Sequence, residues 1–413
     1  MVQAVSKPES VRGSLARVAL VSGALDLGGS TTFLCNLGGE LVRRGCAVQV
    51  LSFERENPLA SDFNRLGVPV IALDGRRTIY EDRLRLILDE LRRFQPTAAL
   101  ANLSATSFEV LRYVPPGVFR LGVAHADHAP VYEIIRHYAS CLDLLAVVSE
   151  EIRRKMGELP EFARVPVRYL PLGVPMPEGN PAAARDVMAP LRILYLGRVD
   201  REQKRVHLFP SIFEKLRSSG IPFHWTIAGE GGERKSLEQI MKNSRSDQTI
   251  SFTGRIAYAE VPHLLSEHDV FLLVSDYEGL PLTLLEAMGC GLVPVVSDLP
   301  SGIRELVDQD TGKRVAPDNL AGYAEAILWL HQHRQEKQQL SANARERVRR
   351  DFSVAAMTDR WLAALPPPPA SEIRWPDRWQ PKPILAAPNP WRFSPPARVL
   401  RRLWLKCFGA HDS

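Results

Sequence analysis

Cysteine is scarce in this chain of 413 residues, and the few cysteines stand far apart. They are Cys35, Cys46, Cys141, Cys290 and Cys407, and no two of them form a Cys-x-x-Cys pair. Disulfide frameworks and structural zinc sites need cysteines that recur at short, regular spacings. The sequence therefore argues against both kinds of site and favours a reducing compartment.

Long apolar runs are missing as well. No stretch approaches the roughly 18–20 apolar residues that a membrane-spanning helix needs. The apolar segment 16–25 is short and runs into Asp26 and two glycines, which is typical of a first strand and its turn rather than of a signal peptide. We expect a cytoplasmic protein that attaches to the inner face of a membrane at most peripherally.

Basic residues only slightly outnumber acidic ones. Lys and Arg number 52 and Asp and Glu number 47, which gives a net charge of +5. Because the basic residues are spread along most of the chain, the charge does not predict nucleic-acid binding.

Two motifs that would indicate other chemistry are also absent. The glycine fingerprint of dinucleotide-binding enzymes, Gly-x-Gly-x-x-Gly, does not follow the first strand, so a nicotinamide dehydrogenase is a distant alternative. His125 and His128 lie close together, but no further ligand has a suitable spacing, so we expect no metal site.

The sequence does contain a repeated strand–helix rhythm. The apolar run 17–22 is followed by a glycine turn, an amphipathic segment 31–44 and a second apolar run 47–52. This unit is the building block of a parallel sheet flanked by helices, and the rhythm continues in the same way downstream. The chain is long enough for two such domains.

A segment without period divides the rhythm. Residues 171–190 are rich in Pro, Gly and Ala, which indicates a linker. We therefore predict one Rossmann-like domain over 16–178, a second over 190–352, and a helix with a tail over 353–413.

The tail has a composition of its own. Residues 366–396 are studded with proline and contain three tryptophans, so a regular helix cannot form there. Residues 397–408 read ARVLRRLWLKCF, a short basic amphipathic helix. Such a helix could lie on an anionic membrane surface or pack on the protein with a solvated basic face, and both alternatives stay open.

The strongest motif is SDYEGLPLTLLEAMG at 275–289. A strand ends at Val274, a tight Glu-Gly-Leu-Pro turn follows, and a helix begins. Unpaired amides at a helix start favour an anion. Glu278 in the turn can accept hydrogen bonds from hydroxyls, and Glu286 within the helix can meet a second hydroxyl pair such as that of a ribose. The motif predicts a site for a nucleoside diphosphate sugar.

A second motif supplies positive charge. Gly197 and Arg198 directly follow a strand, and Lys204 comes six positions later, before the next helix. The carboxyl ends of parallel strands meet at one edge of a sheet, so both cations should point toward the Glu278 turn. There they could neutralise a diphosphate that gains charge as it leaves.

Two weaker signals end strands of the first domain. Gly28 and Gly29 follow the first strand, and glycine lets backbone amides approach a phosphate closely. His125 ends a later strand and could face the same edge, although a single histidine there is more often structural.

Together these strings resemble the retaining glycosyltransferases of the GT-B fold, in the group usually called family 4. The resemblance runs from about residue 17 to residue 352. Its most specific part is the Glu-x7-Glu pattern at Glu278 and Glu286, and the GGS turn, VVSEEI at 147–152 and PLGV at 171–174 also fit.

The resemblance implies two Rossmann-like domains that face each other across a cleft, a UDP- or GDP-linked donor and no metal. Glu278 would hold donor-sugar hydroxyls, Glu286 the ribose, and Arg198 with Lys204 the diphosphate. His125 would lie near the reacting carbon. The further donor contacts that we expect are Gly28, Gly29, Gly197, Gly279, Leu280, Leu282 and Thr283.

The resemblance thus implies retaining transfer of a hexose-type sugar to a hydroxyl of a glycan or glycolipid, as in polysaccharide biosynthesis. One alternative is a nucleotide-sugar epimerase of the same fold, which needs no acceptor. Another is a non-catalytic scaffold subunit, although a scaffold has no need of the intact charged residues of the two motifs.

Overall fold

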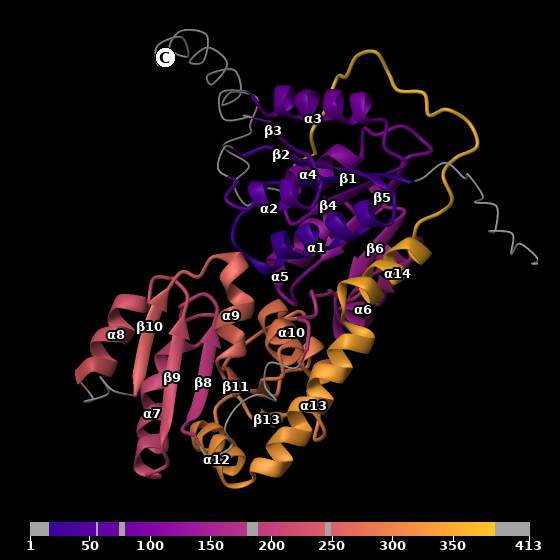
Figure 1. The fold of residues 1–413 in the computed structure, drawn as a ribbon. Helices are drawn as coiled ribbons and strands as arrows, with labels where there is room; N and C mark the ends of the chain where they lie inside the picture. The colour runs from indigo at the N-terminus through magenta and orange to yellow at the C-terminus, as the bar shows by residue number, and fades with distance from the viewer. Residues whose placement is uncertain (1–15, 55–56, 74–78, 180–188, 244–248, 385–413) are drawn as a thin grey trace, which may run out of the picture. The chain divides into compact units, whose positions relative to one another are not determined.

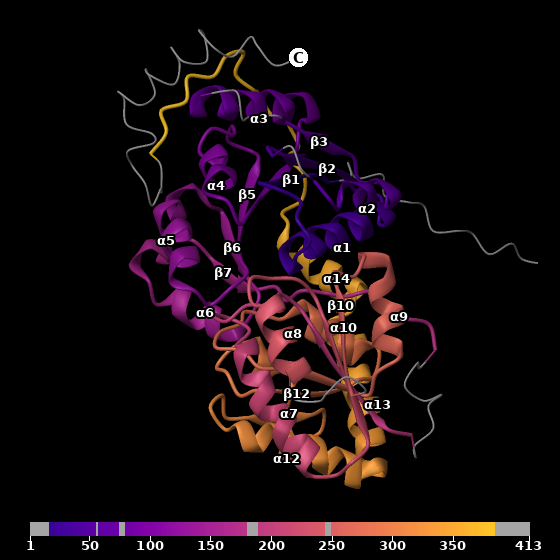
Figure 2. The same ribbon diagram turned by 90° about the vertical axis from the view of Figure 1, so that its left-hand side faces the viewer.

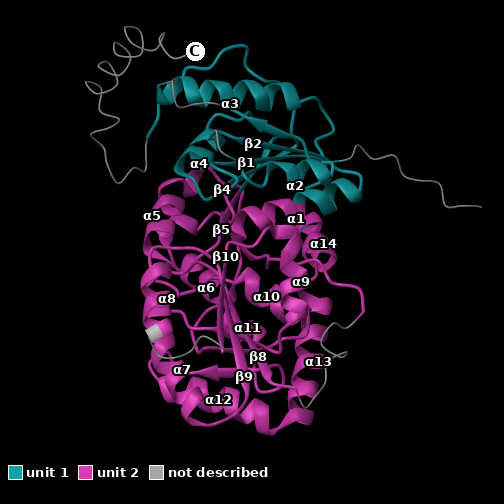
Figure 3. Ribbon diagram, turned by 60° about the vertical axis from the view of Figure 1, so that its left-hand side comes forward, with its two compact units in different colours: residues 1–25, 38–121, 364–413 teal, residues 26–37, 122–363 magenta. Residues whose placement is uncertain are grey.

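The computed structural model describes residues 16–54, 57–73, 79–179, 189–243 and 249–384. The expected leader 1–15, residues 180–188 of the expected linker and the basic helix 397–408 lie outside these residues. The described chain falls into two compact units, which Figure 3 colours separately. Unit 1 draws on 1–25, 38–121 and 364–413, and unit 2 on 26–37 and 122–363.

The first half of the chain forms a seven-stranded sheet in the order β3-β2-β1-β4-β5-β6-β7, with β2 and β4 pairing parallel to β1 (Figure 1). Its central strands are apolar and almost wholly buried, as expected for a sheet covered on both faces. The strands are β1 (Arg17–Ser22), β2 (Ala47–Ser52), β3 (Val70–Ala72), β4 (Ala98–Asn102), β5 (Phe119–Ala124), β6 (Leu144–Val147) and β7 (Val167–Tyr169).

Helices alternate with these strands. The third helix keeps its apolar residues at helical spacing on one buried face. The helices are α1 (Gly29–Arg43), α2 (Ala60–Arg65), α3 (Tyr80–Phe94), α4 (Ala105–Leu111), α5 (Ala129–His137) and α6 (Glu150–Gly157).

The second half forms a six-stranded sheet in the order β10-β9-β8-β11-β12-β13, again with parallel pairs. The strand order reverses at β8, which has β9 on one side and β11 on the other. In such sheets ligands bind outside the carboxyl ends of the strands at this switch point. The strands are β8 (Leu191–Leu196), β9 (Phe223–Ala228), β10 (Ile250–Gly254), β11 (Val270–Leu273), β12 (Val293–Ser297) and β13 (Lys313–Val315).

The helices of this half cover both faces of its sheet. Right-handed crossovers put α7 and α8 on one face and α9, α10 and α11 on the other. Contacts agree, because α12 packs on α7 while α13 packs on α10 (Figure 2). The helices are α7 (Phe209–Ser218), α8 (Arg234–Asn243), α9 (Val261–Ser266), α10 (Leu282–Gly289), α11 (Gly302–Leu306), α12 (Leu320–Gln332) and α13 (Arg334–Asp351). Among the described residues, every helix is too short or too polar to cross a bilayer.

The chain ends its described part with a helix and an extended segment. Helix α14 (Val354–Ala364) packs Trp361 against Phe33 of α1, with 5.6 Å between ring centroids. Residues 365–384, which we call the strap, contain no helix or strand, as their prolines predict. Within unit 1 the strap contacts α3 and the end of α4, where Arg85 and Arg112 each donate to a strap carbonyl at 3.2 Å.

Candidate functional site

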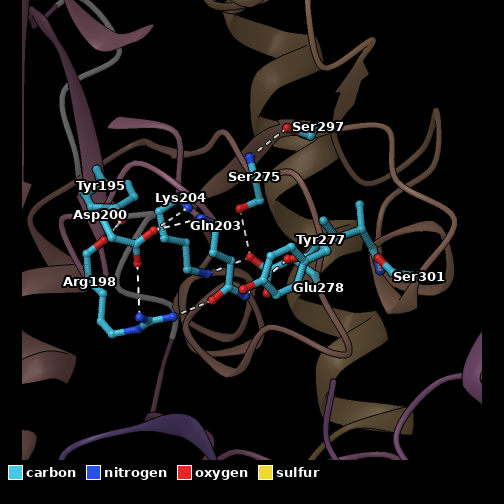
Figure 4. Close-up of polar contacts among 11 residues, drawn as sticks. Tyr195, Arg198, Asp200, Gln203, Lys204, Ser275, Tyr277, Glu278, Ser297 and Ser301 are labelled. Carbon is cyan, nitrogen blue, oxygen red and sulfur yellow. Dashed lines mark hydrogen bonds and ion pairs between the residues drawn. The ribbon is translucent and has the colours of Figure 1, made fainter. Parts of the chain in front are cut away.

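Glu278 is the centre of a polar cluster beyond the end of β11. Its side chain is buried, and one carboxylate oxygen, Oε1, accepts hydrogen bonds from Lys204 Nζ at 2.6 Å and from Ser275 Oγ at 2.7 Å (Figure 4). Within the described part of the chain, the other oxygen, Oε2, accepts no hydrogen bond from protein. The carboxylate is therefore fixed in place while it keeps an acceptor for a ligand.

The loop after β8 presents Lys204 to this carboxylate. Asp200 Oδ1 accepts the backbone N–H of Gln203 at 2.8 Å and that of Lys204 at 2.9 Å, which shapes the turn. Gln203 then ties the loop to the Glu278 turn, because its Nε2 donates to the carbonyl of Tyr277 at 3.1 Å and its carbonyl accepts the N–H of Asp276 at 2.9 Å. The two loops that flank the switch point are thus one hydrogen-bonded unit.

Arg198 lies at the edge of the same cluster. Its side chain is 66% exposed and pairs with Asp200 at 3.2 Å and with Gln203 (Figure 4). The hydroxyl of Tyr195 donates to its carbonyl and fixes its backbone. Arg198 and Lys204 both belong to this cluster, Arg198 exposed and Lys204 nearly buried, and their predicted role toward a diphosphate stays a prediction.

Gly197 packs closely on the next loop. A side chain at Gly229, where φ is +139°, would place its Cβ 1.8 Å from the carbonyl oxygen of Gly197. Only glycine fits at position 229. This close packing fixes the position of the Gly197–Arg198 backbone beside the switch point.

Two helix starts meet near the Glu278 turn. Helix α10 begins at Leu282, and the amides of Leu282 and Thr283 donate no backbone hydrogen bond in the described part of the chain. Helix α1 begins at Gly29, two residues earlier than expected, because the carbonyl of Gly28 accepts the N–H of Thr31 and of Thr32.

The spacing between the two starts is short. A Cβ at Gly29 would lie 3.5 Å from that of Leu282, and one at Gly28 would meet nothing within 4 Å. Both helix ends carry partial positive charge, which favours a negatively charged group beside them.

Glu286 lies on α10, half-buried, and its carboxylate forms no hydrogen bond with the described residues. Burial without a cation raises the pKa of this carboxyl to about 8. A carboxyl with so raised a pKa is a candidate for ligand binding.

His125 directly follows β5, and its ring lies 5.2 Å from that of Phe33. Burial lowers the pKa of its imidazole, so the ring is neutral near pH 7. Its backbone also touches the Glu278 turn, because a Cβ at Gly279 would lie 2.0 Å from the carbonyl oxygen of His125. The next residue of the turn, Leu280, is buried.

The sequence did not point to the residues that support this cluster. Tyr195, Asp200, Gln203 and Ser275 hold the predicted side chains in place. Ser275 opens the motif at 275–289, but the sequence predicts no role for any of the four. Asp200 alone left a local signal, since an Asp side chain in a loop commonly accepts the backbone N–H groups of residues a few positions later. In the described part of the chain, no group of three or more His, Cys, Asp or Glu is placed to hold a metal ion.

Comparison with known proteins adds the family. Residues 184–347 match the profile described as Glycosyl transferases group 1. An Escherichia coli (strain K12) protein named as a colanic acid biosynthesis glycosyltransferase, WcaL, is 32% identical over 300 residues, which cover 65% of this chain and 73% of that protein. Glycogen synthase of Mycobacterium tuberculosis is 30% identical over 242 residues, which cover 57% of each chain.

A solved structure supports the fold. Staphylococcus aureus TarM, in a complex that includes UDP, superposes with a TM-score of 0.72 over 84% of this chain and 99% of that one, at 12% identity. The predicted pair of parallel α/β sheets is therefore confirmed as the GT-B fold. With this fold and the E. coli relative in hand, the chain belongs to the glycosyl transferases group 1 family and is a glycosyltransferase.

Proposed function

We propose that this glycosyltransferase moves a hexose-type sugar from a UDP- or GDP-linked donor to a hydroxyl of a glycan or glycolipid acceptor. The observation that carries the proposal is the state of Glu278. Lys204 and Ser275 hold its Oε1, while its Oε2 accepts no protein hydrogen bond in the described part of the chain. A buried, fixed carboxylate with one open acceptor suits the hydroxyls of a donor sugar.

The diphosphate would lie against the starts of α10 and α1. Lys204 Nζ has three donors and gives one to Glu278, so it can also reach a phosphate oxygen. Arg198 is exposed beside it and can close over the same group. These cations and the free amides of Leu282 and Thr283 would stabilise the charge that develops on the leaving nucleotide.

The nucleoside would place its ribose at Glu286. At pH 7 a carboxyl whose pKa is about 8 is largely protonated, so it can donate one hydrogen bond and accept another. A ribose presents two neighbouring hydroxyls that match this pairing.

Transfer would proceed with retention and without a metal. The bond between the anomeric carbon and the phosphate oxygen breaks, and the acceptor oxygen bonds to the same face. The acceptor proton passes to the departing phosphate, and neutral His125 lies near the reacting carbon. Positive charge from Lys204, Arg198 and the helix ends would stabilise the leaving diphosphate, as a metal ion does in other transferases.

The relatives support the substrate class. One is named for the synthesis of colanic acid and another as a glycogen synthase, and the TarM structure holds UDP. We accordingly propose a role in polysaccharide biosynthesis, with donor binding in the domain 190–352 and acceptor binding in the domain 16–178.

Nucleotide release from UDP-, GDP- and ADP-sugars, with and without EDTA, tests the proposal. We expect release from one donor, unchanged by EDTA and lost in Glu278→Gln, with the anomeric configuration of that donor kept in the product. Loss of activity in EDTA contradicts the metal-free reaction. Conversion of the donor into an epimer without acceptor contradicts transfer.

A further inference from the structure

Two aromatic side chains stack beside the site, and neither has a role in the proposed transfer reaction. The rings of His128 and Tyr277 lie nearly parallel, with centroids 4.9 Å apart and planes 7° apart. His128 precedes the first residue of α5, and Tyr277 precedes Glu278 in the turn after β11. The stack therefore joins the segment that carries His125 to the turn that carries Glu278.

A second contact joins the same two segments. The carbonyl of His125 lies so close to Gly279 that a Cβ there would stand 2.0 Å from its oxygen. Residues 125–128 thus touch residues 277–279 at both ends, through backbone at one end and through rings at the other. Two separated contacts fix the orientation of one segment on the other, whereas a single contact leaves it free to pivot.

The other restraints on Glu278 come from a different direction. Lys204, Ser275 and Gln203 tie the turn to the loop after β8 and to the end of β11. The N–H of Gly302 at the start of α11 also donates to the carbonyl of Gly279 at 2.8 Å. None of them sets how far the Glu278 carboxylate lies from the imidazole of His125. That separation depends on the contacts of residues 125–128.

We propose that His128 and Tyr277 are a positioning pair that sets the geometry between Glu278 and His125 at the sugar end of the donor. The inference rests on the proposed function, in which Glu278 holds sugar hydroxyls and His125 lies near the reacting carbon. Loss of the stack tilts the turn and misplaces the sugar. The phosphates stay bound, because Lys204 and the start of α10 hold them without help from the stack.

The test separates sugar placement from nucleotide binding. The wild-type protein first identifies the donor through nucleotide release. Tyr277→Ala and His128→Ala should each lower kcat about tenfold, since small misplacements of a reacting group cost one to two orders of magnitude. The Kd of the matching nucleoside diphosphate, measured by titration calorimetry, should stay within about twofold of wild type.

Conservative variants give the second readout. Tyr277→Phe and His128→Phe keep a ring in the stack and should retain most of kcat. The double variant His128→Ala with Tyr277→Ala should be no slower than either single variant, because the second change removes a partner whose contact is already lost.

A matched control exists elsewhere in unit 2. Trp329 and His333 stack with centroids 4.4 Å apart at an interplanar angle of 11°, and neither belongs to an element that carries a site residue. His333→Ala should lower the Tm at least as much as His128→Ala and leave kcat unchanged.

Three results overturn the inference. Full activity in Tyr277→Ala shows that the stack positions nothing. An equal loss in Tyr277→Phe and Tyr277→Ala shows that the hydroxyl, rather than the ring contact, is at work. A matching loss of kcat in His333→Ala shows that stability alone is at work. Failure of the wild-type protein to turn over any donor is a separate result that refutes the proposed function and the inference with it.

Discussion

Two cations of the site differ in how much of the fold depends on them. Arg198 is 66% exposed, whereas Lys204 is 12% exposed and is hydrogen-bonded to the buried carboxylate of Glu278. Arg198→Ala should therefore leave the Tm nearly unchanged while it lowers turnover about 10²–10³-fold, the usual loss for one charge-stabilising group.

Lys204→Met should lower both the Tm and the turnover, because it leaves the carboxylate of Glu278 buried with only Ser275 as a partner. Thermal unfolding and nucleotide release on the same samples check the contrast. Near wild-type turnover in Arg198→Ala refutes its assigned role.

Glu286 should make stability depend on pH. Its folded pKa of about 8 lies above the ordinary value of 4.5, so the folded protein holds the proton more tightly than the unfolded chain does. The contribution of Glu286 to the free energy of unfolding is fully present below about pH 4.5. It is lost as the pH rises from there through 8. In Glu286→Gln this loss disappears, so the variant should melt several degrees above wild type at pH 9 and close to it at pH 5. A gap of constant size at both pH values contradicts the raised pKa.

For single residues, the sequence predicts those expected to face the ligand better than those that hold them in place. Glu278 and Glu286 are recognisable from their spacing around a helix start, and Arg198 and Lys204 from their place after a strand. Ser275 and Gln203 are not, because each acts through a partner that lies elsewhere in the chain or in the next turn, and polar residues on loops have no periodic signal. The roles of the ligand-facing residues stay predictions until a donor is bound.

The strap offers a prediction at the level of elements. Within unit 1 the side chain of Glu109 is wholly buried and accepts hydrogen bonds from Arg112 Nη1 at 2.6 Å and from the hydroxyl of Tyr113 at 3.0 Å. Arg112 also donates to the strap carbonyl of Lys382. Arg112→Ala should destabilise unit 1 by roughly 2–3 kcal/mol, because it strips a buried carboxylate of its cation.

Arg85→Ala is the matched control for this change. Arg85 also contacts the strap, through the carbonyl of Trp379, but its ion pair with Asp82 is exposed. Arg85→Ala should lower the free energy of unfolding by less than about 1 kcal/mol. Urea unfolding with hydrogen exchange read at α3 and α4 measures both variants, and equal effects contradict a special role for the Arg112–Glu109 pair.

Elements differ in how well the sequence reveals them. The apolar strands β1 and β2 are predicted residue by residue, because each is a mostly apolar run that ends at a clear turn. The edge strands β7 and β13 and the short helices α4, α5 and α11 were not predicted. Each has only three to nine residues, too few for a period to show, and β13 begins with two basic residues.

For the molecule as a whole, the sequence predicts two α/β sheets because the strand–helix rhythm stops in the Pro- and Gly-rich segment and starts again after it. Strand order does not follow from that rhythm. It follows from crossover handedness and from the reversal at β8, which only the pairing of strands reveals. The reversal matters most for function, because it brings the loops after β8 and β11 together.

The most direct test of the account is a calorimetric titration of a UDP-sugar or GDP-sugar, and of the matching nucleoside diphosphate, into wild type and Glu278→Gln. Glu278 is assigned to the sugar, while the start of α10 and the cations are assigned to the phosphates. The account predicts that the variant binds the sugar nucleotide at least about tenfold more weakly and the nucleoside diphosphate almost as well as wild type does. Equal affinity of the two proteins for the sugar nucleotide would show that Glu278 does not hold the sugar.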